Sequence, residues 1–250
     1  MKKRPCILRR RVAFYFLNLK RNPLQIVLYS IYEVVAMFFL YGERETAYLK
    51  SRDKRLGEAI DKIGHINRTV DSDLFSSVVH HIMGQQISTA AQVTLWNRLQ
   101  ERLGTVAASE ILALGREELQ AVGMTFRKAD YILNFAEKVQ SGEFDIDGLS
   151  RLTDEQAIAE LSSLKGVGVW TAEMILTFCM QRPDVVSFGD LAIQRGMRML
   201  YRRKNIDKIN FERYRKRYSP YGTVASFYLW AVAGGAIPEL TDPAQKRAVK

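Results

Sequence analysis

The apolar residues from residue 41 onward recur with a helical period. In 43–64 they fall every three to four positions among charged residues, which predicts one amphipathic helix ending at Gly64. Further helices are predicted over 74–83, between an N-cap at Ser88 and a stop at Gly104, and over about 127–140. Strand-like alternation is nearly absent. We therefore expect an all-α fold of many helices, each about 8–15 residues long.

A glycine hairpin interrupts this helical pattern within the stretch LKGVGVWTAEMILTFCMQRPDVVSFGDLAIQRG, residues 164–196. A helix capped at Thr153 or Asp154 is predicted to reach Leu164, and a second helix to begin at about Val169. The glycines in Gly166-Val167-Gly168 allow a sharp turn with positive φ. Free N–H groups at the start of the second helix suit a phosphate oxygen. An ordinary turn between helices needs only one glycine, so the hairpin alone leaves both interpretations open.

The charge of the chain adds a candidate partner. The 250 residues carry a net charge of +10, which favours an acidic partner such as nucleic acid. The basic residues concentrate in two patches. The first, 1–36, has eight basic residues against Glu33 alone, and the second, 195–217, has ten against Asp207 and Glu212. The second patch follows Asp190 directly, at the end of the hairpin stretch.

Cysteine and histidine are scarce. The two cysteines, Cys6 and Cys179, exclude a disulfide framework and favour a reducing compartment. They also exclude a four-cysteine iron–sulfur cluster or zinc site within the chain. The histidines are His65, His80 and His81. Because neighbours on a helix point to different faces, we expect His80 and His81 to form a poor metal site and to be satisfied surface or core residues.

Residues 1–40 differ from the rest of the chain. A basic half is followed by an apolar segment, 24–40, which is interrupted by Gln25, Ser30 and Glu33. A bilayer span needs about 20 apolar residues, and a glutamate inside it is costly. No clean cleavage site for a signal peptide follows. We therefore disfavour a membrane anchor and treat 1–40 as an extension of uncertain role, with Met37 as a possible true start.

Five motifs together resemble one family. They are HHIMGQQIS (80–88), GMTFRKADYI (123–132), LKGVGVWTAEMIL (164–176), FGDLAIQRG (188–196) and SPYGTVASFYLW (219–230). Hairpin, second helix, Gly/Pro-containing loop and aspartate resemble the helix-hairpin-helix-GPD superfamily of DNA base-excision glycosylases, and most of all the DNA-3-methyladenine glycosylase II type. The resemblance covers most of 41–250. It implies two helical domains with a cleft between them, here about 75–185 and 41–74 plus 186–250.

The resemblance also implies the residues of a catalytic site. Asp190 matches the catalytic aspartate of the family, whose carboxylate stabilises an oxocarbenium-like sugar or orients a water. Trp170, Met174 and Trp230 match the base pocket, although some relatives have Tyr in place of Met174. Alkylated purines of this kind are cationic, so aromatic walls bind them with about 0.5–2 kcal/mol per cation–π contact. Tyr221 or Tyr228 is a weaker candidate for the same cleft.

Other matched positions are expected to contact DNA. Phe126 matches the residue that wedges into the gap left by a flipped base, and Gln86 is a candidate second probe. The hairpin, Gly166 to Gly168, and Arg195 are expected at phosphates, together with Arg198, Arg202, Arg203 and Lys204. The backbone carbonyls of Ser162, Leu164 and Val167 match positions that hold an optional monovalent cation in relatives.

Structural interpretations stand beside these functional ones. Asp190 is a good N-cap for a helix that begins at Leu191, and it can serve in both roles. Trp230 lies in an apolar run typical of a core, and Phe126 is a plausible apolar staple at a helix entry. Runs of basic residues are often only a solvated face. These alternatives stay open at this level.

The resemblance implies a monofunctional enzyme that removes a base without cutting the strand. Bifunctional relatives have a lysine where this chain has Trp170, and Lys165 lies before the hairpin and does not match. We expect a cytoplasmic, nucleoid-associated monomer that acts on damaged double-stranded DNA without a required cofactor or a membrane. The alternatives are a non-catalytic DNA-binding module, which Asp190 beside two matching tryptophans disfavours, and a membrane-tethered interaction protein, which rests only on 24–40. The preferred damaged base stays open.

Overall fold

The computed structural model describes residues 38–71 and 73–244, so nearly all of the N-terminal extension lies outside the described residues. The described part contains eleven α-helices and one 3₁₀ helix, with a single isolated bridge between Phe38 and Thr69 in place of any strand. The predicted all-α fold is confirmed. None of the described helices has both the length and the apolar character needed to cross a membrane.

The first predicted helix is in fact two helices. α1 spans Glu43–Arg52 and α2 spans Lys54–Ile63. Asp53 between them has extended backbone angles, and its carboxylate accepts a hydrogen bond from the backbone N–H of Leu56. The same carboxylate accepts hydrogen bonds from Tyr201 and Arg217. The apolar period runs through the break, so the prediction of one helix over 43–64 was wrong because it ignored this capping aspartate.

The middle of the chain forms helices close to those predicted. Ser88, Thr125 and Thr153 cap their helices with side-chain hydrogen bonds. One glycine, Gly115, has a φ of 79° inside α5, so that this element consists of two short helical pieces. The elements are α3 Leu74–Gly84, α4 Thr89–Leu103, α5 Ala108–Ala121, α6 Phe126–Ser141, η1 Asp147–Arg151 and α7 Asp154–Ser162.

Four helices complete the described chain: α8 Val169–Phe178, α9 Leu191–Tyr201, α10 Lys208–Tyr218 and α11 Gly222–Ala233. The backbones of α9 and α11 approach each other closely. A Cβ atom at Gly196 of α9 would collide with the backbone carbonyl oxygen of Leu229 in α11. This glycine therefore sets the distance between the two helices, which is a packing role and not a turn.

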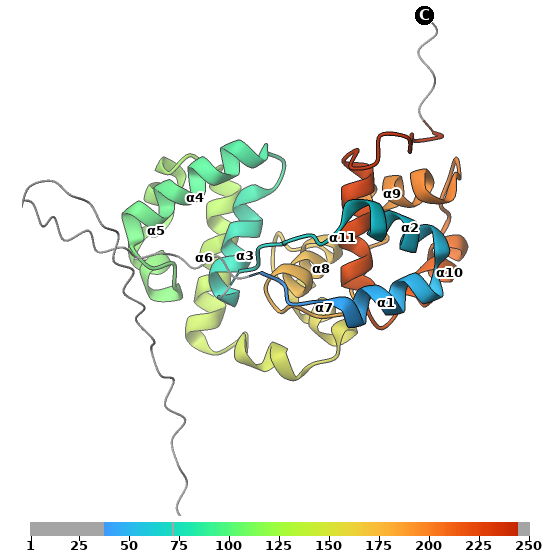
Figure 1. Cartoon of the computed structure of the whole chain (residues 1–250). Coiled ribbons are helices and arrows are strands. Elements are labelled where there is room, and N and C mark those ends of the chain that lie inside the picture. The colour runs from blue at the N-terminus through green and yellow to red at the C-terminus, as the bar shows by residue number, and fades with distance from the viewer. Residues whose placement is uncertain (1–37, 72, 245–250) are drawn as a thin grey trace, which may run out of the picture. The chain divides into compact units, whose positions relative to one another are not determined.

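The apolar core consists of two clusters. The first draws its buried residues from α3 to α8 and the loops among them, and the second from α1, α2 and α9 to α11. In Figure 1, α4, α5 and α6 lie on one side, and α1, α2, α9, α10 and α11 lie on the other. Contacts also join the chain from Ala36 onward into one compact unit. The predicted division into two domains stays a prediction.

Candidate active site

The carboxylate of Asp190 is fixed first by its own helix. Asp190 is the N-cap of α9, and its Oδ1 accepts hydrogen bonds from the backbone N–H groups of Ala192 (2.9 Å) and Ile193 (2.8 Å). Its residue surface is only 7% exposed. The predicted capping role is confirmed. The positive end of the helix dipole also favours a negative charge at this place.

Two tryptophans hold the same carboxylate from two other helices. Trp170 of α8 donates from Nε1 to Oδ2 of Asp190 at 2.9 Å, and Trp230 of α11 donates from Nε1 to Oδ1 at 3.2 Å. Together with the capping bonds, these donors come from α8, α9 and α11. The orientation of Asp190 is therefore set by tertiary contacts, as a preorganised charged group requires.

Asp190 and the expected pocket residues line one cavity of about 700 Å³. Trp170 is 47% exposed, whereas Met174, one turn further along α8, is only 4% exposed. The structure thus brings Trp170 and Met174 of α8 together with Asp190 and Trp230, which lie 20 and 60 residues after Trp170 in the sequence. Their roles toward a ligand stay predictions. The other residues of this lining are Arg68, Thr69, Asp71, His80, His81, Gly84, Gln85, Gln86, Ile87, Thr89, Gln92 and Phe178.

Trp230 contributes both to the cavity and to the second core cluster. Its ring stacks near Phe178, with ring centroids 5.6 Å apart, and near Phe227, with centroids 6.1 Å apart. The guanidinium carbon of Arg68 lies over the rings of Phe178 and Trp230, at 5.6 Å from each centroid. The pocket interpretation and the core interpretation of Trp230 therefore do not exclude each other. The indole of Trp230 therefore already contacts a cationic side chain of the protein, that of Arg68.

Asp71, His80 and His81 form a polar group in the same lining. One possible ligand atom from each lies within 4.8 Å of the others, which is a spacing that a metal ion can bridge. Nδ1 of His81 contacts the carbonyl oxygen of Ser77 at 2.8 Å, and the Ser77 hydroxyl donates to Asp71 at 2.7 Å. Burial lowers the pKa of His80, which favours its neutral form. Asp71 from the preceding loop approaches both histidines, and the expectation that they form a poor metal site stays a prediction.

Of the two hairpin glycines, only Gly166 has a positive φ. Gly166 has a φ of +84°, whereas Gly168 has a φ of −93° and is the N-cap of α8. The space beside Gly166 is filled by the ring of Tyr131, so a Cβ atom there would collide with it, whereas a Cβ at Gly168 would meet nothing within 4 Å. Val167 is buried and its N–H donates to the carbonyl of Leu164 at 3.1 Å.

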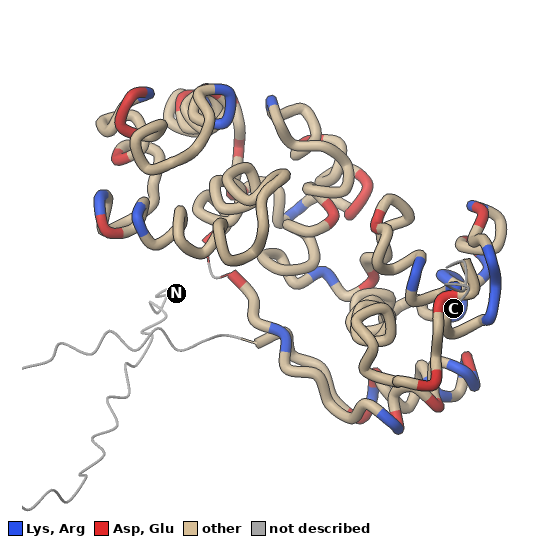
Figure 2. Tube along the Cα trace, turned by 90° about the horizontal axis from the view of Figure 1, so that it is seen from above, with Lys and Arg blue, Asp and Glu red and all other residues tan. Residues whose placement is uncertain are grey.

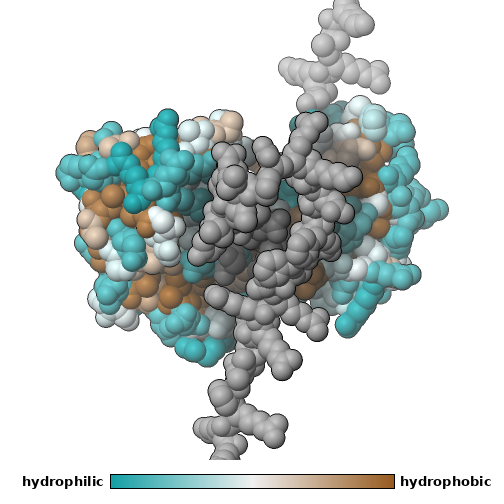
Figure 3. Space-filling model, turned by 60° about the vertical axis from the view of Figure 1, so that its left-hand side comes forward, coloured by the Kyte–Doolittle hydropathy of each residue, from teal (hydrophilic) through white to brown (hydrophobic). Residues whose placement is uncertain are grey.

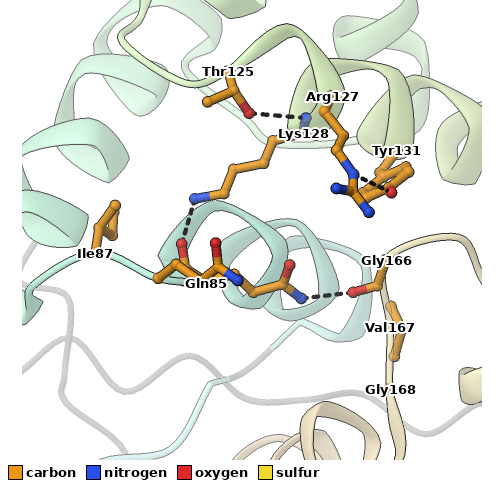
Figure 4. A pocket seen from close by; sticks show the side chains of 10 residues that line it. Gln85, Ile87, Thr125, Arg127, Lys128, Tyr131, Gly166, Val167 and Gly168 are labelled. Atoms are coloured by element: carbon orange, nitrogen blue, oxygen red, sulfur yellow. Dashed lines mark hydrogen bonds between the residues drawn. The ribbon is translucent and has the colours of Figure 1, made fainter.

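A second cavity, of about 680 Å³, lies against the hairpin (Figure 4). Gln85 donates from its side chain to the carbonyl of Gly166 at 2.6 Å, and the ammonium of Lys128 donates to the carbonyl of Gln85 at 2.6 Å. Burial lowers the pKa of Lys128. These bonds tie the hairpin, the loop after α3 and the start of α6 together. The cation expected at the carbonyls of Ser162, Leu164 and Val167 stays a prediction.

The expected wedge residues lie at accessible positions. Phe126 is the first residue of α6 and is 43% exposed, with the guanidinium of Arg116 over its ring at 4.3 Å. Gln86 is exposed, has a φ of 58° and contributes to both cavities. On the face drawn in Figure 3, apolar patches lie among hydrophilic side chains. The wedge and probe roles of Phe126 and Gln86 stay predictions.

The basic residues after Asp190 differ in their surroundings. Arg198 forms a two-point ion pair with the buried Asp242, at 2.9 Å and 2.6 Å, so its charge is already compensated and does not fit the expected phosphate contact. Arg195 is half-buried on α9. Arg202, Arg203 and Lys204 are exposed directly after the end of α9. Figure 2 shows how the basic and acidic residues are distributed along the chain.

Several lining residues had no clear signal in the sequence. Arg68 and Asp71 stand in a loop before α3 without a motif of their own, and Phe178 reads as the apolar end of a helix. Gln85 lies in the quoted motif HHIMGQQIS, but nothing in the spacing shows that it reaches the hairpin. The motif was therefore the available signal for Gln85. The positions of Arg68, Asp71 and Phe178 depend on long-range packing, which the sequence does not show.

The chain is similar to known proteins in sequence and in fold. A family model, described as HhH-GPD superfamily base excision DNA repair protein, matches residues 79–220. The chain is 28% identical over 211 residues to DNA-3-methyladenine glycosylase 1 of Schizosaccharomyces pombe, covering 80% of this chain and 90% of that one. The crystal structure of a DNA-3-methyladenine glycosidase from Bacillus halodurans has a TM-score of 0.73 at 32% identity, covering 81% of this chain and 95% of that one.

A second solved structure, the 3-methyladenine DNA glycosylase of Schizosaccharomyces pombe in complex with abasic DNA, has a TM-score of 0.64 at 27% identity. It covers 75% of this chain and 95% of that chain. The match to the family model spans more than half of the chain and includes the hairpin, Asp190 and the residues between them. The chain therefore belongs to the HhH-GPD superfamily of base excision DNA repair proteins.

Proposed function

We propose that this protein is a monofunctional DNA glycosylase that hydrolyses damaged purine bases, of the 3-methyladenine type, from double-stranded DNA. The observation that carries the proposal is the Asp190 carboxylate, which Trp170 and Trp230 hold in the wall of a cavity. The similar proteins named DNA-3-methyladenine glycosylase support it, and so does the relative solved with abasic DNA.

The chemistry follows from the fixed negative charge. A base inside a duplex is out of reach, so the damaged nucleotide is flipped into the cavity. As the N-glycosidic bond breaks, positive charge develops on the sugar, and Asp190 stabilises that charge or orients the water that attacks it. Both tryptophan N–H groups point at the carboxylate. They keep it aligned without taking part in bond making.

The absence of a nucleophile at the start of α8 determines the expected product. Trp170 stands there, and its indole nitrogen has no nucleophilic chemistry toward a sugar. We expect the product DNA to contain intact abasic sites, with strand breaks appearing only after alkali, on a denaturing gel. Trapping of a covalent protein–DNA adduct with borohydride would contradict this.

The direct test is incubation of the purified protein with methylated duplex DNA, followed by identification of the released bases by mass spectrometry. Release of an alkylated purine supports the proposal. Binding to DNA without release of any base would favour a non-catalytic helix-hairpin-helix module instead. The same assay with a chelator present tests the proposal that no cofactor is required, which matters because Asp71, His80 and His81 can hold a metal ion.

The hairpin offers a matched pair of substitutions. Gly168→Ala adds a Cβ atom that meets nothing within 4 Å in the protein, so folding should be preserved. If the amides there bind a DNA phosphate, the added Cβ would stand where the DNA approaches and should weaken binding about 3- to 10-fold on damaged and undamaged duplex alike. Fluorescence anisotropy with both duplexes measures this. A loss confined to discrimination between lesions would place the hairpin in the base pocket.

Gly166→Ala is the comparison within the same turn. Its positive φ and the contact with Tyr131 should lower the free energy of unfolding by about 1–3 kcal/mol. Thermal melting of the two variants separates the folding role of one glycine from the binding role of the other. Equal melting temperatures for both variants would contradict the assignment of strain to Gly166.

We also propose that the protein acts as a monomer. Asp190 obtains its hydrogen-bond donors from α8, α9 and α11 of its own chain. Such a site needs no second copy to complete it.

A further inference from the structure

The cavity that holds Asp190 runs along one face of α8. Trp170, Met174 and Phe178 of this helix all line it, and their spacing of four residues places them on the same face. Eight residues of α-helix rise about 12 Å, which separates the first ring from the last. The three side chains therefore form an apolar stripe along the cavity.

Each end of this stripe lies beside one carboxylate. At the first end, Trp170 donates from Nε1 to Asp190 at 2.9 Å. At the other end, the N–H of Asp71 donates to the carbonyl of Phe178 at 2.7 Å, which attaches the loop before α3 to the last residue of α8. A flipped nucleotide whose sugar stands at Asp190 would therefore extend its base along the stripe, toward Asp71.

The side chain of Asp71 is oriented by a buried hydroxyl. Ser77 of α3 is 1% exposed and donates from Oγ to Oδ2 of Asp71 at 2.7 Å. Asp71 itself is half-buried and contributes to the cavity lining. Among the described residues, Ser77 is the one hydrogen-bond donor to this carboxylate, so Oδ1 can accept a hydrogen bond from a ligand.

The negative charge of Asp71 has no direct partner in the protein. Within the part of the chain that the structure describes, no lysine, arginine or histidine nitrogen lies within 4.0 Å of its carboxylate. Burial lowers the pKa of the neighbouring His80, which favours its neutral form. Arg68 also lines the cavity, but its side chain is exposed, so water and salt screen its charge.

We propose that Asp71 is a specificity-determining residue, which favours purines that carry both a formal positive charge and an exocyclic amino group. The inference rests on the proposed function and names the feature of the base that the cavity reads. Two opposite unit charges about 6 Å apart, at an effective dielectric constant of about 20, attract enough to change a rate or an affinity roughly 10- to 100-fold. The carboxylate can also accept a hydrogen bond from the amino group.

The test compares a cationic with a neutral lesion in the same duplex sequence. Single-turnover excision of 7-methylguanine, which is cationic and has an amino group, and of 1,N6-ethenoadenine, which has neither feature, gives a rate ratio for each protein. Asp71→Asn keeps the size of the side chain and an acceptor for Ser77 but removes the charge. It should lower the ratio of cationic to neutral excision about 10-fold, whereas Asp71→Glu should retain most of it.

Asp73→Asn is the matched control. Asp73 lies two residues further along, is exposed, caps α3 and is not part of the cavity lining. The same chemical change at this position should leave the ratio at the wild-type value, because asparagine is also a good N-cap. All assays contain EDTA, so that no metal ion at Asp71, His80 and His81 masks the charge.

The outcomes separate the inference from the function on which it rests. An unchanged ratio in Asp71→Asn overturns the specificity role, whatever the absolute rates are, because a purely structural role lowers excision of both lesions together. If Asp71→Asn melts early, Asp71→Ser replaces it in the same measurement. If the neutral lesion is released too slowly to time, competitive binding of the two duplexes gives the ratio instead. Failure of the wild-type protein to release any base from methylated DNA refutes the proposed function itself.

Discussion

Asp190→Asn is expected to lower the rate of base release by about 10²–10³-fold, because it removes the negative charge that Trp170, Trp230 and the N-terminus of α9 hold in place. Binding to DNA should change little, since the neutral amide keeps the size of the side chain. Single-turnover kinetics on methylated duplex, beside anisotropy on the same DNA, measure the two effects separately. Wild-type turnover in this variant would disprove the assignment of Asp190 as the catalytic residue.

The substitution also changes the hydrogen bonds around the side chain. Asparagine has one carbonyl oxygen, which can keep the capping bonds to Ala192 and Ile193 and the bond from Trp230. Its amide nitrogen then faces Nε1 of Trp170, so that two donors oppose each other. A buried donor left unsatisfied costs about 1–3 kcal/mol.

Asp207→Asn supplies the matched control for this experiment. Asp207 is the N-cap of α10, accepts a hydrogen bond from the N–H of Asn210 and lies on the surface. The control makes the same chemical change at a helix N-cap away from the cavity. The free energy of unfolding of this variant should lie within about 1 kcal/mol of the wild-type value, and its activity should be unchanged.

Gly196→Ala should destabilise the protein by about 3 kcal/mol, although alanine is the better helix former. The added Cβ would collide with the carbonyl oxygen of Leu229, which is backbone of α11 and cannot rotate away. The two helices must separate, and with them the N-cap of α9 and the indole of Trp230 on α11. Base release should therefore fall together with the melting temperature.

Urea unfolding of Gly196→Ala beside Gly42→Ala checks this expectation. A Cβ at Gly42 would meet nothing within 4 Å, so its effect should be small. A Gly196→Ala variant as stable as wild type would show that α9 and α11 can shift without cost. It would then also contradict the view that their distance sets the 3.2 Å bond between Trp230 and Asp190.

Local patterns predicted the helices well, because caps and periods are local. Ser88, Thr153 and Asp190 cap the helices expected of them. The break at Asp53 was missed although its capping signal is local; the side chains that reinforce it, Tyr201 and Arg217, lie more than 140 residues away. The hairpin was predicted as a turn, but the sequence does not show that Gly166 takes the positive φ, nor that Tyr131 of α6 packs against it.

Only those candidate site residues that lie in one of the quoted motifs could be predicted from the sequence. Asp190, Trp170, Met174 and Trp230 line one cavity, as the resemblance implied. Arg68, in contrast, stands in a loop whose position depends on backbone bonds to Phe39 and Phe178. No period or spacing in the sequence reports such bonds.

The position of Asp190 has a consequence for the cell that makes this protein. An enzyme that strips bases from DNA is itself a hazard, since every misdirected turnover creates a lesion. Here Trp170 belongs to α8, which packs into the first core cluster, whereas α9 and α11 belong to the second. A chain whose first core is unformed lacks the bond from Trp170, and one whose second core is unformed lacks the capping bonds and the bond from Trp230. Such copies should remove fewer bases than the mature protein, because the complete set of bonds to the carboxylate needs both cores.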